Sequence, residues 1–311
     1  MDAEYHTPVL LQEAMDGLDI REGGIYVDAT FGGGGHSREI LRRLGEAGRL
    51  LAFDRDPDAA ERAGQDPDFV KAGQRFILVR ENFRYLKNYL RFYKAVPVDG
   101  ILADLGVSSH QFDVAERGFS IRSRGPLDMR MDRSGALTAA DVLNTYAEED
   151  LARVFTQYGE IPSGRRLASA VVKAREGNPF AYTDQAVDFF APFAGKGREN
   201  KFLATVFQSL RIEVNRELEN LKSLLEQSLE VLRPGGRIAV ISYHSLEDRM
   251  VKNFMRSGNV EGRVEKDFYG NDLSGMEPVV RKAIVPSQEE ICRNPRARSA
   301  RLRVGRKRME E

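Results

Sequence analysis

The sequence predicts an α/β fold, an open parallel sheet interrupted by an inserted helical subdomain. Three patterns predict it. Short apolar runs alternate with helical periodicity over residues 1–106, strand-like runs are sparse over residues 107–202, and a strand pattern returns within residues 203–311. We therefore expect a discontinuous core formed by residues 1–106 and 203–311, with residues 107–202 as the insertion.

The first segment supplies four predicted strands, each a buried apolar run followed by polar or glycine-rich residues. These runs are Ile25–Thr30, Arg49–Phe53, Phe76–Val79 and Val98–Ala103. Helical patterns separate them and are found from Ser37, over Ala59–Ala63 behind Pro57, and over Tyr85–Phe92. Because strands and helices alternate at this spacing, we expect right-handed crossovers and parallel strands.

The insertion is predicted to be helical. Its expected helices are Thr138–Val142, Glu148–Tyr158, Arg165–Arg175 and Asp184–Phe193. Apolar residues spaced by three and four from Leu203 to Leu232 then predict one continuous helix, which Pro234-Gly-Gly236 ends. Arg237–Ser242 follows as a strand, so we expect the sheet to resume after the insertion.

The composition is that of an ordinary globular chain of 311 residues, 41% hydrophobic and 30% charged. No apolar stretch is long enough to cross a bilayer, and the first residues lack a secretory signal. We therefore expect a cytoplasmic protein with no membrane partner. Cys292 is the only cysteine, which excludes an internal disulfide and a cysteine-based metal cluster, and four scattered histidines do not suggest a zinc site. No metal is expected.

The charge is unevenly distributed although the formal net charge is zero. Eight Arg or Lys residues and no acid occupy the sixteen positions from Arg293 to Arg308, here called the basic strip. A basic strip on a mildly acidic body is typical of phosphate binding. A solvated tail explains the same charges, and the sequence leaves both interpretations open.

A cofactor site is predicted at the carboxyl ends of the strands, where ligands of open parallel sheets bind. Asp28 precedes the loop Phe31-Gly-Gly-Gly-Gly-His36, whose glycines let backbone approach a ligand, and Ser37 opens a helix whose N-terminus favours a carboxylate. Asp54 follows the next strand, where an acid suits the two hydroxyls of an adenosine ribose. The ring of Phe83 can lie against an adenine or belong to the core.

Two cofactors fit this pattern, a nicotinamide dinucleotide and S-adenosylmethionine. The loop has Gly32 and Gly34 but Ser37 at the third position of the dinucleotide fingerprint. Asp28 can meet a cationic methionine portion, whereas it would repel a pyrophosphate. The residues therefore favour S-adenosylmethionine and methyl transfer over an oxidoreductase.

A set of longer motifs is specific enough to compare with known families. The motifs are Tyr5-His-Thr-Pro-Val-Leu10, Asp28-Ala-Thr-Phe-Gly-Gly-Gly-Gly-His-Ser37, Asp104-Leu-Gly-Val-Ser-Ser109, Arg117-Gly-Phe-Ser120, Gly125-Pro-Leu-Asp-Met-Arg-Met-Asp132, Phe207-Gln-Ser-Leu-Arg-Ile212, Ser242-Tyr-His-Ser-Leu-Glu-Asp-Arg249 and Asn294-Pro-Arg-Ala-Arg-Ser299. In this order they closely resemble the bacterial 16S rRNA cytosine-N4 methyltransferases, the RsmH (formerly MraW) family. Gly33 departs from the pattern, since many relatives have arginine there.

The resemblance implies a class I, Rossmann-like S-adenosylmethionine methyltransferase sheet with a helical insertion after the fourth strand. It implies methylation of the exocyclic N4 of a cytidine in the decoding centre (P site) of 16S rRNA, with the 30S small ribosomal subunit as substrate. A homodimer is left open. The cofactor contacts that it implies are Gly34, Gly35, His36, Asp54, Phe83, Asp104 and Gln111.

Two residues are candidates for the chemistry at the amine. Asp104 can accept amine hydrogens or serve only the cofactor, and His244 can accept or relay a proton or simply cap and pack. A non-catalytic ribosome-assembly factor is a further alternative. Phosphate contacts are expected from the basic strip and from four arginines of the insertion, Arg117, Arg122, Arg124 and Arg130.

Overall fold

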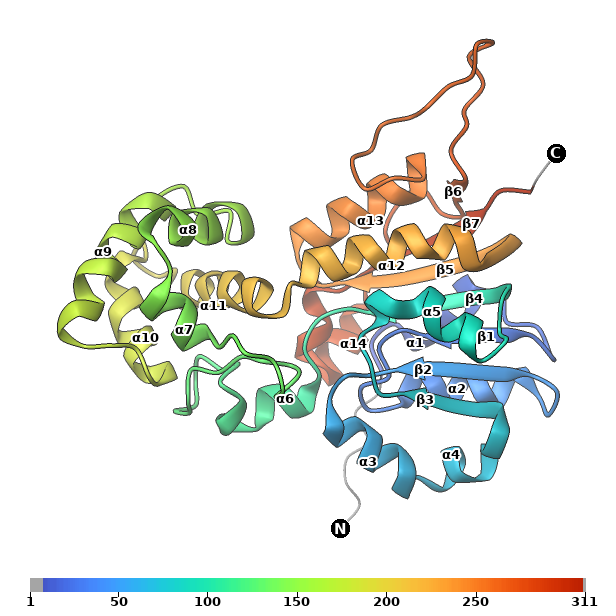
Figure 1. Ribbon diagram of the computed structural model, residues 1–311, viewed down its shortest axis with the longest axis horizontal. Coiled ribbons are helices and arrows are strands. Elements are labelled where there is room, and N and C mark those ends of the chain that lie inside the picture. The colour runs from blue at the N-terminus through green and yellow to red at the C-terminus, as the bar shows by residue number, and fades with distance from the viewer. Residues whose placement is uncertain (1–7, 310–311) are drawn as a thin grey trace. The chain divides into compact units, whose positions relative to one another are not determined.

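A computed structural model describes residues 8–309 of the chain (Figure 1). The chain divides into two compact units, one formed by the residues up to Gly106 and from Glu219 onward, the other by Val107–Leu218. The second boundary therefore lies after Leu218, later than the expected one after residue 202. Within residues 8–309, no helix is both long and apolar enough to span a membrane. Tyr5, His6 and Thr7 of the first motif lie outside the described residues.

The first unit is built on one sheet in the order β3-β2-β1-β4-β5-β7-β6. Neighbouring strands from β3 to β5 are parallel, and β7 is antiparallel to both β5 and β6. The predicted α/β fold with a Rossmann-like parallel sheet is confirmed. The strands are β1 (Ile25–Asp28), β2 (Arg49–Phe53), β3 (Phe76–Val79), β4 (Val98–Asp104), β5 (Leu232–Ser242), β6 (Met276–Pro278) and β7 (Arg301–Lys307).

The strand order reverses between β1 and β4, because the chain runs outward from β1 to β3 and returns on the other side of β1. Ligands of open parallel sheets bind outside the carboxyl ends of the strands at such a point. Those ends here are Asp28 and Asp104. The amide of Ala29 donates to the carbonyl of Leu102 at 2.8 Å and keeps the two strand ends side by side.

Helices cover both faces of this sheet. Along β2, Leu50 and Ala52 belong to one apolar cluster and Leu51 and Phe53 to another, because successive side chains of a strand point to opposite faces. The first cluster is completed by α1 (Leu11–Leu18), α2 (Gly35–Leu44), α3 (Pro57–Gln65) and α4 (Pro67–Ala72). The second is completed by α5 (Leu86–Phe92), α12 (Glu217–Val231) and α13 (Ser245–Ser257). Shorter elements of this unit are η1 (Gly73–Arg75), η2 (Phe83–Tyr85), α14 (Gln288–Arg293) and η6 (Pro295–Ser299).

The second unit is helical in its described residues and has an apolar cluster of its own. Thr138 begins α7 with a capping box, since its hydroxyl accepts from the amide of Asp141 and the Asp141 carboxylate accepts from the amide of Thr138. The elements are α6 (Ser109–Asp113), η3 (Ala115–Arg117), α7 (Ala139–Thr145), α8 (Glu148–Arg153), the π-helical turn η4 (Val154–Tyr158), α9 (Gly164–Gly177), α10 (Thr183–Phe190), η5 (Ala191–Phe193) and α11 (Glu199–Asn215).

The prediction of one continuous helix from Leu203 to Leu232 is wrong. Helix α11 ends at Asn215, and Arg216 adopts the left-handed conformation with φ 49°, which terminates the helix before α12 begins. The apolar stripe continues across this break but serves two cores, since its first half belongs to the cluster of the second unit and its second half to the sheet. This break explains the later domain boundary.

The basic strip is not a solvated tail, so that interpretation is wrong. Its second half is β7, paired on both sides within the sheet. Arg303 forms an ion pair with Asp248 at 2.7 Å, and both side chains are nearly buried. Arg306 pairs with Glu277 and Arg308 with Asp272. Much of the positive charge of the strip is therefore neutralised within the protein.

Two of the four arginines expected to contact phosphates serve the second unit itself. Arg117 is 2% exposed and donates to the carbonyl oxygens of Arg130 and Met131. Arg130 pairs with the carboxylate of Asp128 at 2.7 Å. The expectation of a phosphate contact is therefore wrong for the buried Arg117, and the partly exposed Arg130 already has a carboxylate partner. Arg122 and Arg124 are exposed.

Candidate active site

The end of β1 is fixed by Asp28, whose side chain is fully buried. One carboxylate oxygen accepts from the Ser37 hydroxyl at 2.7 Å and the other from the Thr30 amide at 3.0 Å. Burial raises the pKa of Asp28, although these donors oppose the shift. Asp28 thus braces the glycine loop against α2, and a direct contact with the methionine portion of a cofactor is not available to it.

The glycine loop is shaped by packing within the protein. A Cβ atom on Gly34, whose φ is +75°, would lie 2.7 Å from the ring of Phe69, and one on Gly35 would lie 2.2 Å from Pro8. A Cβ atom on Gly33 would have no atom within 4 Å. This open position has room for a longer side chain.

The loop leads directly into the first turn of α2. The backbone N–H groups of Gly35, His36 and Ser37 have no hydrogen-bond acceptor within residues 8–309, as is usual for a first helical turn. Together with the positive end of the helix dipole, such groups favour an anionic ligand. This turn can therefore hold a carboxylate.

The imidazole of His36 is buried, and its Nε2 donates to the carbonyl of Val9 at 3.1 Å. Burial lowers the pKa of His36 to about 4, so the ring is neutral at pH 7. Because a carbonyl can only accept, the proton lies on Nε2 and Nδ1 is an acceptor. Nδ1 lies 3.7 Å from Oδ2 of Asp104, and with a neutral ring this contact is not an ion pair. His36 can thus offer a ligand its backbone N–H but no charge.

Asp54, directly after β2, ties the glycine loop to the loop that follows. Its Oδ2 accepts from the amide of Gly32 at 2.8 Å and its Oδ1 from the amide of Asp56 at 2.9 Å. Burial raises the pKa of Asp54 to about 6. Each oxygen keeps a second lone pair, so this half-buried carboxylate can still accept hydrogen bonds from two ribose hydroxyls.

Asp104 ends β4 on the other side of the switch in strand order. Its amide donates to the hydroxyl of Thr30 at 2.6 Å, and its Oδ1 accepts from the phenolic hydroxyl of Tyr243 at 2.8 Å. Burial raises the pKa of Asp104 to about 7, and the carboxylates of Asp28 and Glu247 raise it as well. The side chain stays 22% exposed. Asp104 is therefore an accessible carboxyl that titrates near neutrality.

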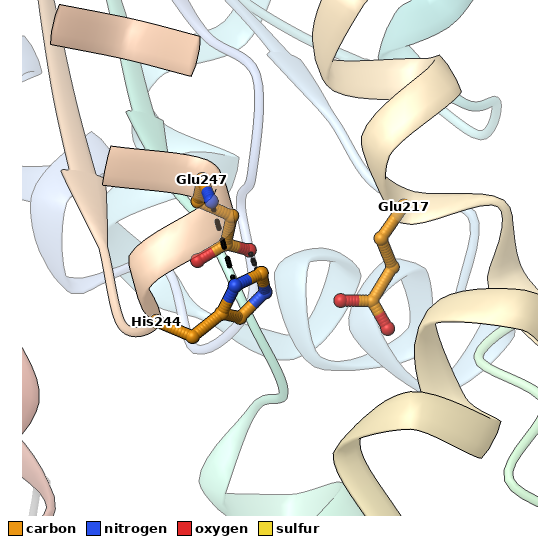
Figure 2. A group of neighbouring side chains, drawn as sticks. All are labelled: Glu217, His244 and Glu247. Carbon is orange, nitrogen blue, oxygen red and sulfur yellow. Dashed lines mark hydrogen bonds and ion pairs between the residues drawn. The ribbon is translucent and has the colours of Figure 1, made fainter. Parts of the chain in front are cut away.

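His244 is the N-cap of α13, and Figure 2 shows it beside Glu247. Its Nδ1 accepts from the amide of Glu247 at 3.4 Å, so the ring proton lies on Nε2, 3.2 Å from Oε1 of Glu247. That second contact lacks the geometry of a hydrogen bond. Nδ1 uses its lone pair in this cap and would need the same lone pair to take a proton. The contacts of His244 therefore favour a capping role over base catalysis.

The two remaining predicted contacts lie apart from this cluster in the chain. Phe83 begins η2, where Asn82 caps the amide of Arg84 at 2.9 Å, and its ring packs partly buried against the second apolar cluster. Gln111 belongs to the second unit, where its side chain is buried and accepts from the amide of Ser108 at 3.2 Å. The first unit thus brings together the glycine loop, Asp54 and Asp104.

Sequence reasoning missed three residues of this cluster: Thr30, Tyr243 and Glu247. Glu247 is 2% exposed, and its Oε2 accepts from the amide of Tyr243 at 2.9 Å. One signal was available, because Tyr243 directly follows β5, the strand that pairs with β4 up to Asp104. Its partner across the sheet could not be read from the sequence.

Comparison with known proteins assigns the chain to a family. Residues 3–308 match the model described as the MraW methylase family. The chain belongs to this family. Ribosomal RNA small subunit methyltransferase H of Bacteroides thetaiotaomicron is 56% identical over 303 residues, 97% of each chain. The protein of the same name in Flavobacterium johnsoniae is 54% identical over 304 residues, 98% of each chain.

Among solved structures, an rRNA methylase of Streptococcus thermophilus aligns with 98% of this chain and 99% of its own, at 12% identity and a TM-score of 0.42. As a member of the MraW methylase family, the chain is a methyltransferase whose cofactor is S-adenosylmethionine. The site fits the positively charged sulfur of this cofactor, because no Lys or Arg in the described part of the chain lies within ion-pair distance of Asp104 and neutralises its carboxylate.

Proposed function

We propose that this MraW-family methyltransferase methylates the exocyclic N4 of a cytidine in the decoding centre, at the P site, of 16S rRNA. Its substrate and partner is then the 30S subunit, in the cytoplasm. The proposal is supported by relatives that are more than half identical over nearly their whole length and are named for methylation of small-subunit rRNA. The observation that carries it is the partly exposed carboxyl of Asp104, a hydrogen-bond acceptor at the switch in strand order.

We infer the cofactor contacts from the family resemblance, and the geometry of the first unit supports several of them. The first-turn amides of α2 would hold the methionine carboxylate, and Asp54 the ribose hydroxyls. Phe83 would lie against the adenine. When bound, S-adenosylmethionine supplies an electrophilic methyl group on a positively charged sulfur. The full set of proposed contacts is Gly34, Gly35, His36, Asp54, Phe83, Asp104 and Gln111.

The substrate amine sets what the protein must do. The lone pair of a cytosine amine is delocalised into the ring, so the amine is a poor nucleophile. The site therefore has to hold the amine in line with the methyl group and accept its hydrogens. Oδ2 of Asp104 is suited to this task, since Oδ1 is occupied by Tyr243. Because the positive charge disperses during transfer, a site with little water also favours the reaction.

The proposed catalytic role of His244 stays a prediction, and one substitution tests it. Asparagine caps helices well but cannot relay a proton. His244→Asn should therefore leave kcat near the wild-type value if the residue only caps α13. A loss of kcat of a hundredfold or more with unchanged thermal stability would instead establish a proton-transfer role.

We further propose that the second unit recognises the substrate. A base in folded RNA has to leave its stack before it can reach a methyl donor at a protein site, and the surrounding phosphates then need cations. Arg122 is exposed and has no ion pair in the described part of the chain. Arg124 is exposed as well but pairs with Asp184 at 3.1 Å. Arg122 is thus the better candidate.

Methyl transfer to isolated subunits tests the proposed function. Small subunits from a strain that lacks the modification are incubated with tritiated S-adenosylmethionine, and the rRNA is digested to nucleosides. We expect label in N4-methylcytidine from one position. Fully modified subunits serve as the control acceptor and should take up no label. Another labelled nucleoside, or none, would refute the assignment.

A further inference from the structure

Tyr243 links Asp104, at the end of β4, to Glu247, in the first turn of α13. Its hydroxyl donates to Oδ1 of Asp104 at 2.8 Å, and its backbone amide donates to Oε2 of Glu247 at 2.9 Å. Burial raises the pKa of Tyr243 strongly, and the Asp104 carboxylate raises it further. The phenol is therefore protonated at neutral pH and is the donor in this contact.

The turn after β4 is shaped to admit this ring. Gly106 has φ +105°, a conformation that side-chain-bearing residues rarely adopt. A Cβ atom there would lie 3.2 Å from the ring of Tyr243. The amide of Leu105 donates to the carbonyl of Ile241 at 2.9 Å, which continues the β4–β5 pairing up to this point. Backbone and side chain thus hold the phenol against Asp104 from both strands.

We propose that Tyr243 is a positioning residue for Asp104: its hydroxyl fixes Oδ1 and leaves Oδ2 to accept the amine proton. The inference rests on the proposed amine methylation. Oδ2 takes the proton that the amine nitrogen loses as it bonds to the methyl carbon. The carbon–sulfur bond breaks at the same time, and its electron pair stays on sulfur, which becomes neutral.

The hydroxyl has a second effect, because a donor to a carboxylate favours the ionised form. The other groups of the first unit that face this pair do not. They are Asp28 from β1, the neutral His36 from α2, Glu247 from α13 and Glu290 from α14. Tyr243 is thus the neighbour that lowers the pKa of Asp104, so that a substantial fraction of this carboxyl is ionised and able to accept a proton near neutral pH.

The variant Tyr243→Phe tests the inference, because it removes the hydroxyl and keeps the ring. Loss of one hydrogen bond to a charged acceptor raises its pKa by about 1–2 units. The acidic limb of the kcat/KM profile should therefore move up by about 1–2 pH units, with a loss of about fivefold to fiftyfold at pH 7, where the wild-type carboxyl is itself about half ionised, and recovery in alkaline buffer. A merely structural role would lower activity by the same factor at every pH and would overturn the inference.

Tyr26→Phe is the matched control, since Tyr26 is also a buried tyrosine of the first unit whose hydroxyl hydrogen-bonds, here to the carbonyl of Asp19. It should leave the pH profile unmoved. In an Asp104→Asn background, Tyr243→Phe should cause no further loss, and an additional tenfold loss there would contradict the mechanism.

Equilibrium binding separates this inference from the proposed function. Since Asp104 is a proposed cofactor contact, the affinity for S-adenosylmethionine should rise as this carboxyl ionises, and Tyr243→Phe should shift that rise to higher pH. The measurement needs no RNA. A wild-type protein that fails to methylate subunits but shows this shift would refute the substrate and leave the role of Tyr243 standing. Binding curves that coincide for the two proteins would refute that role.

Discussion

Replacing Asp104 by asparagine should stabilise the free protein while it slows methyl transfer strongly. The carboxyl pKa is raised from 3.8 to about 7 in the folded state, mainly by burial. Since the folded state binds the proton more tightly than the unfolded state, the stabilising contribution is complete below pH 3.8 and is lost as the pH rises through 7. Above that range the folded protein carries an unfavourable buried charge, which asparagine removes.

The change in the free energy of unfolding follows from the shift in the pKa of Asp104. About three pKa units at ~1.4 kcal/mol each amount to roughly 4 kcal/mol when both states are ionised. Between pH 5 and pH 8 the difference is about 2–3 kcal/mol, because the unfolded carboxyl is already ionised at pH 5. For a unit of about 200 residues this corresponds to roughly 4–12 °C in the midpoint of thermal unfolding.

Thermal unfolding of wild type and Asp104→Asn at pH 5 and pH 8 measures this directly. The advantage of the variant should be larger at pH 8 than at pH 5. Asp99→Asn is the matched control in the same strand, since Asp99 is buried but pairs with Arg233 at 2.7 Å and accepts from the amide of Ile25. It should destabilise at both pH values. An Asp104→Asn variant no more stable than wild type at pH 8 would refute the reasoning.

Three further predictions concern stability and binding. Because the pKa of His36 is lowered, neutral His36 contributes to the free energy of unfolding fully above pH 6.5, and this contribution is lost as the pH falls through about 4. In urea unfolding, the free energy of unfolding of His36→Asn should therefore fall by up to about 3 kcal/mol less than that of the wild type over this pH range. Gly34→Ala should cost about 1–3 kcal/mol in the same assay because of its positive φ, whereas Gly33→Arg should change stability by less than about 0.5 kcal/mol. Arg303→Ala should cost about 1–3 kcal/mol, because Asp248 loses its nearest cation and keeps only the longer contact with Arg301. Exposed Arg298→Ala should preserve stability and reduce the salt slope of subunit binding by about 1, and equal effects of the two substitutions would contradict the division of the basic strip.

The parts of the fold that the sequence predicted are those fixed by local patterns. The four strands of the first segment were predicted correctly because each is a short apolar run. The structure brings the glycine loop, Asp54 and Asp104 together, as expected for polar residues at the carboxyl ends of parallel strands. Position along a strand is thus enough to group candidate residues in this class of sheet, even before their neighbours are known.

The errors arose where a pattern continued across a change in structure. Hydrophobic periodicity does not report a backbone dihedral angle, so the left-handed conformation of Arg216 between two helices was invisible to it. The charges of the basic strip could not reveal that Asp248 and Glu277 neutralise part of them, because these acids lie far away in the sequence. For the same reason, no motif could show that the phenol of Tyr243 contacts Asp104.

That last contact also bears on the order in which the protein acquires its activity. Residues that hold the cofactor loop, from Asp28 to Asp54, are close in sequence and can assemble as soon as the first strands pair. The hydrogen bond from Tyr243 to Asp104 spans 139 positions, and the pairing of β4 with β5 closes a loop of similar length. Contacts of such long range form slowly. A chain emerging from the ribosome is therefore expected to complete the proposed proton acceptor last, so that it can methylate RNA only after its own synthesis and folding are nearly finished.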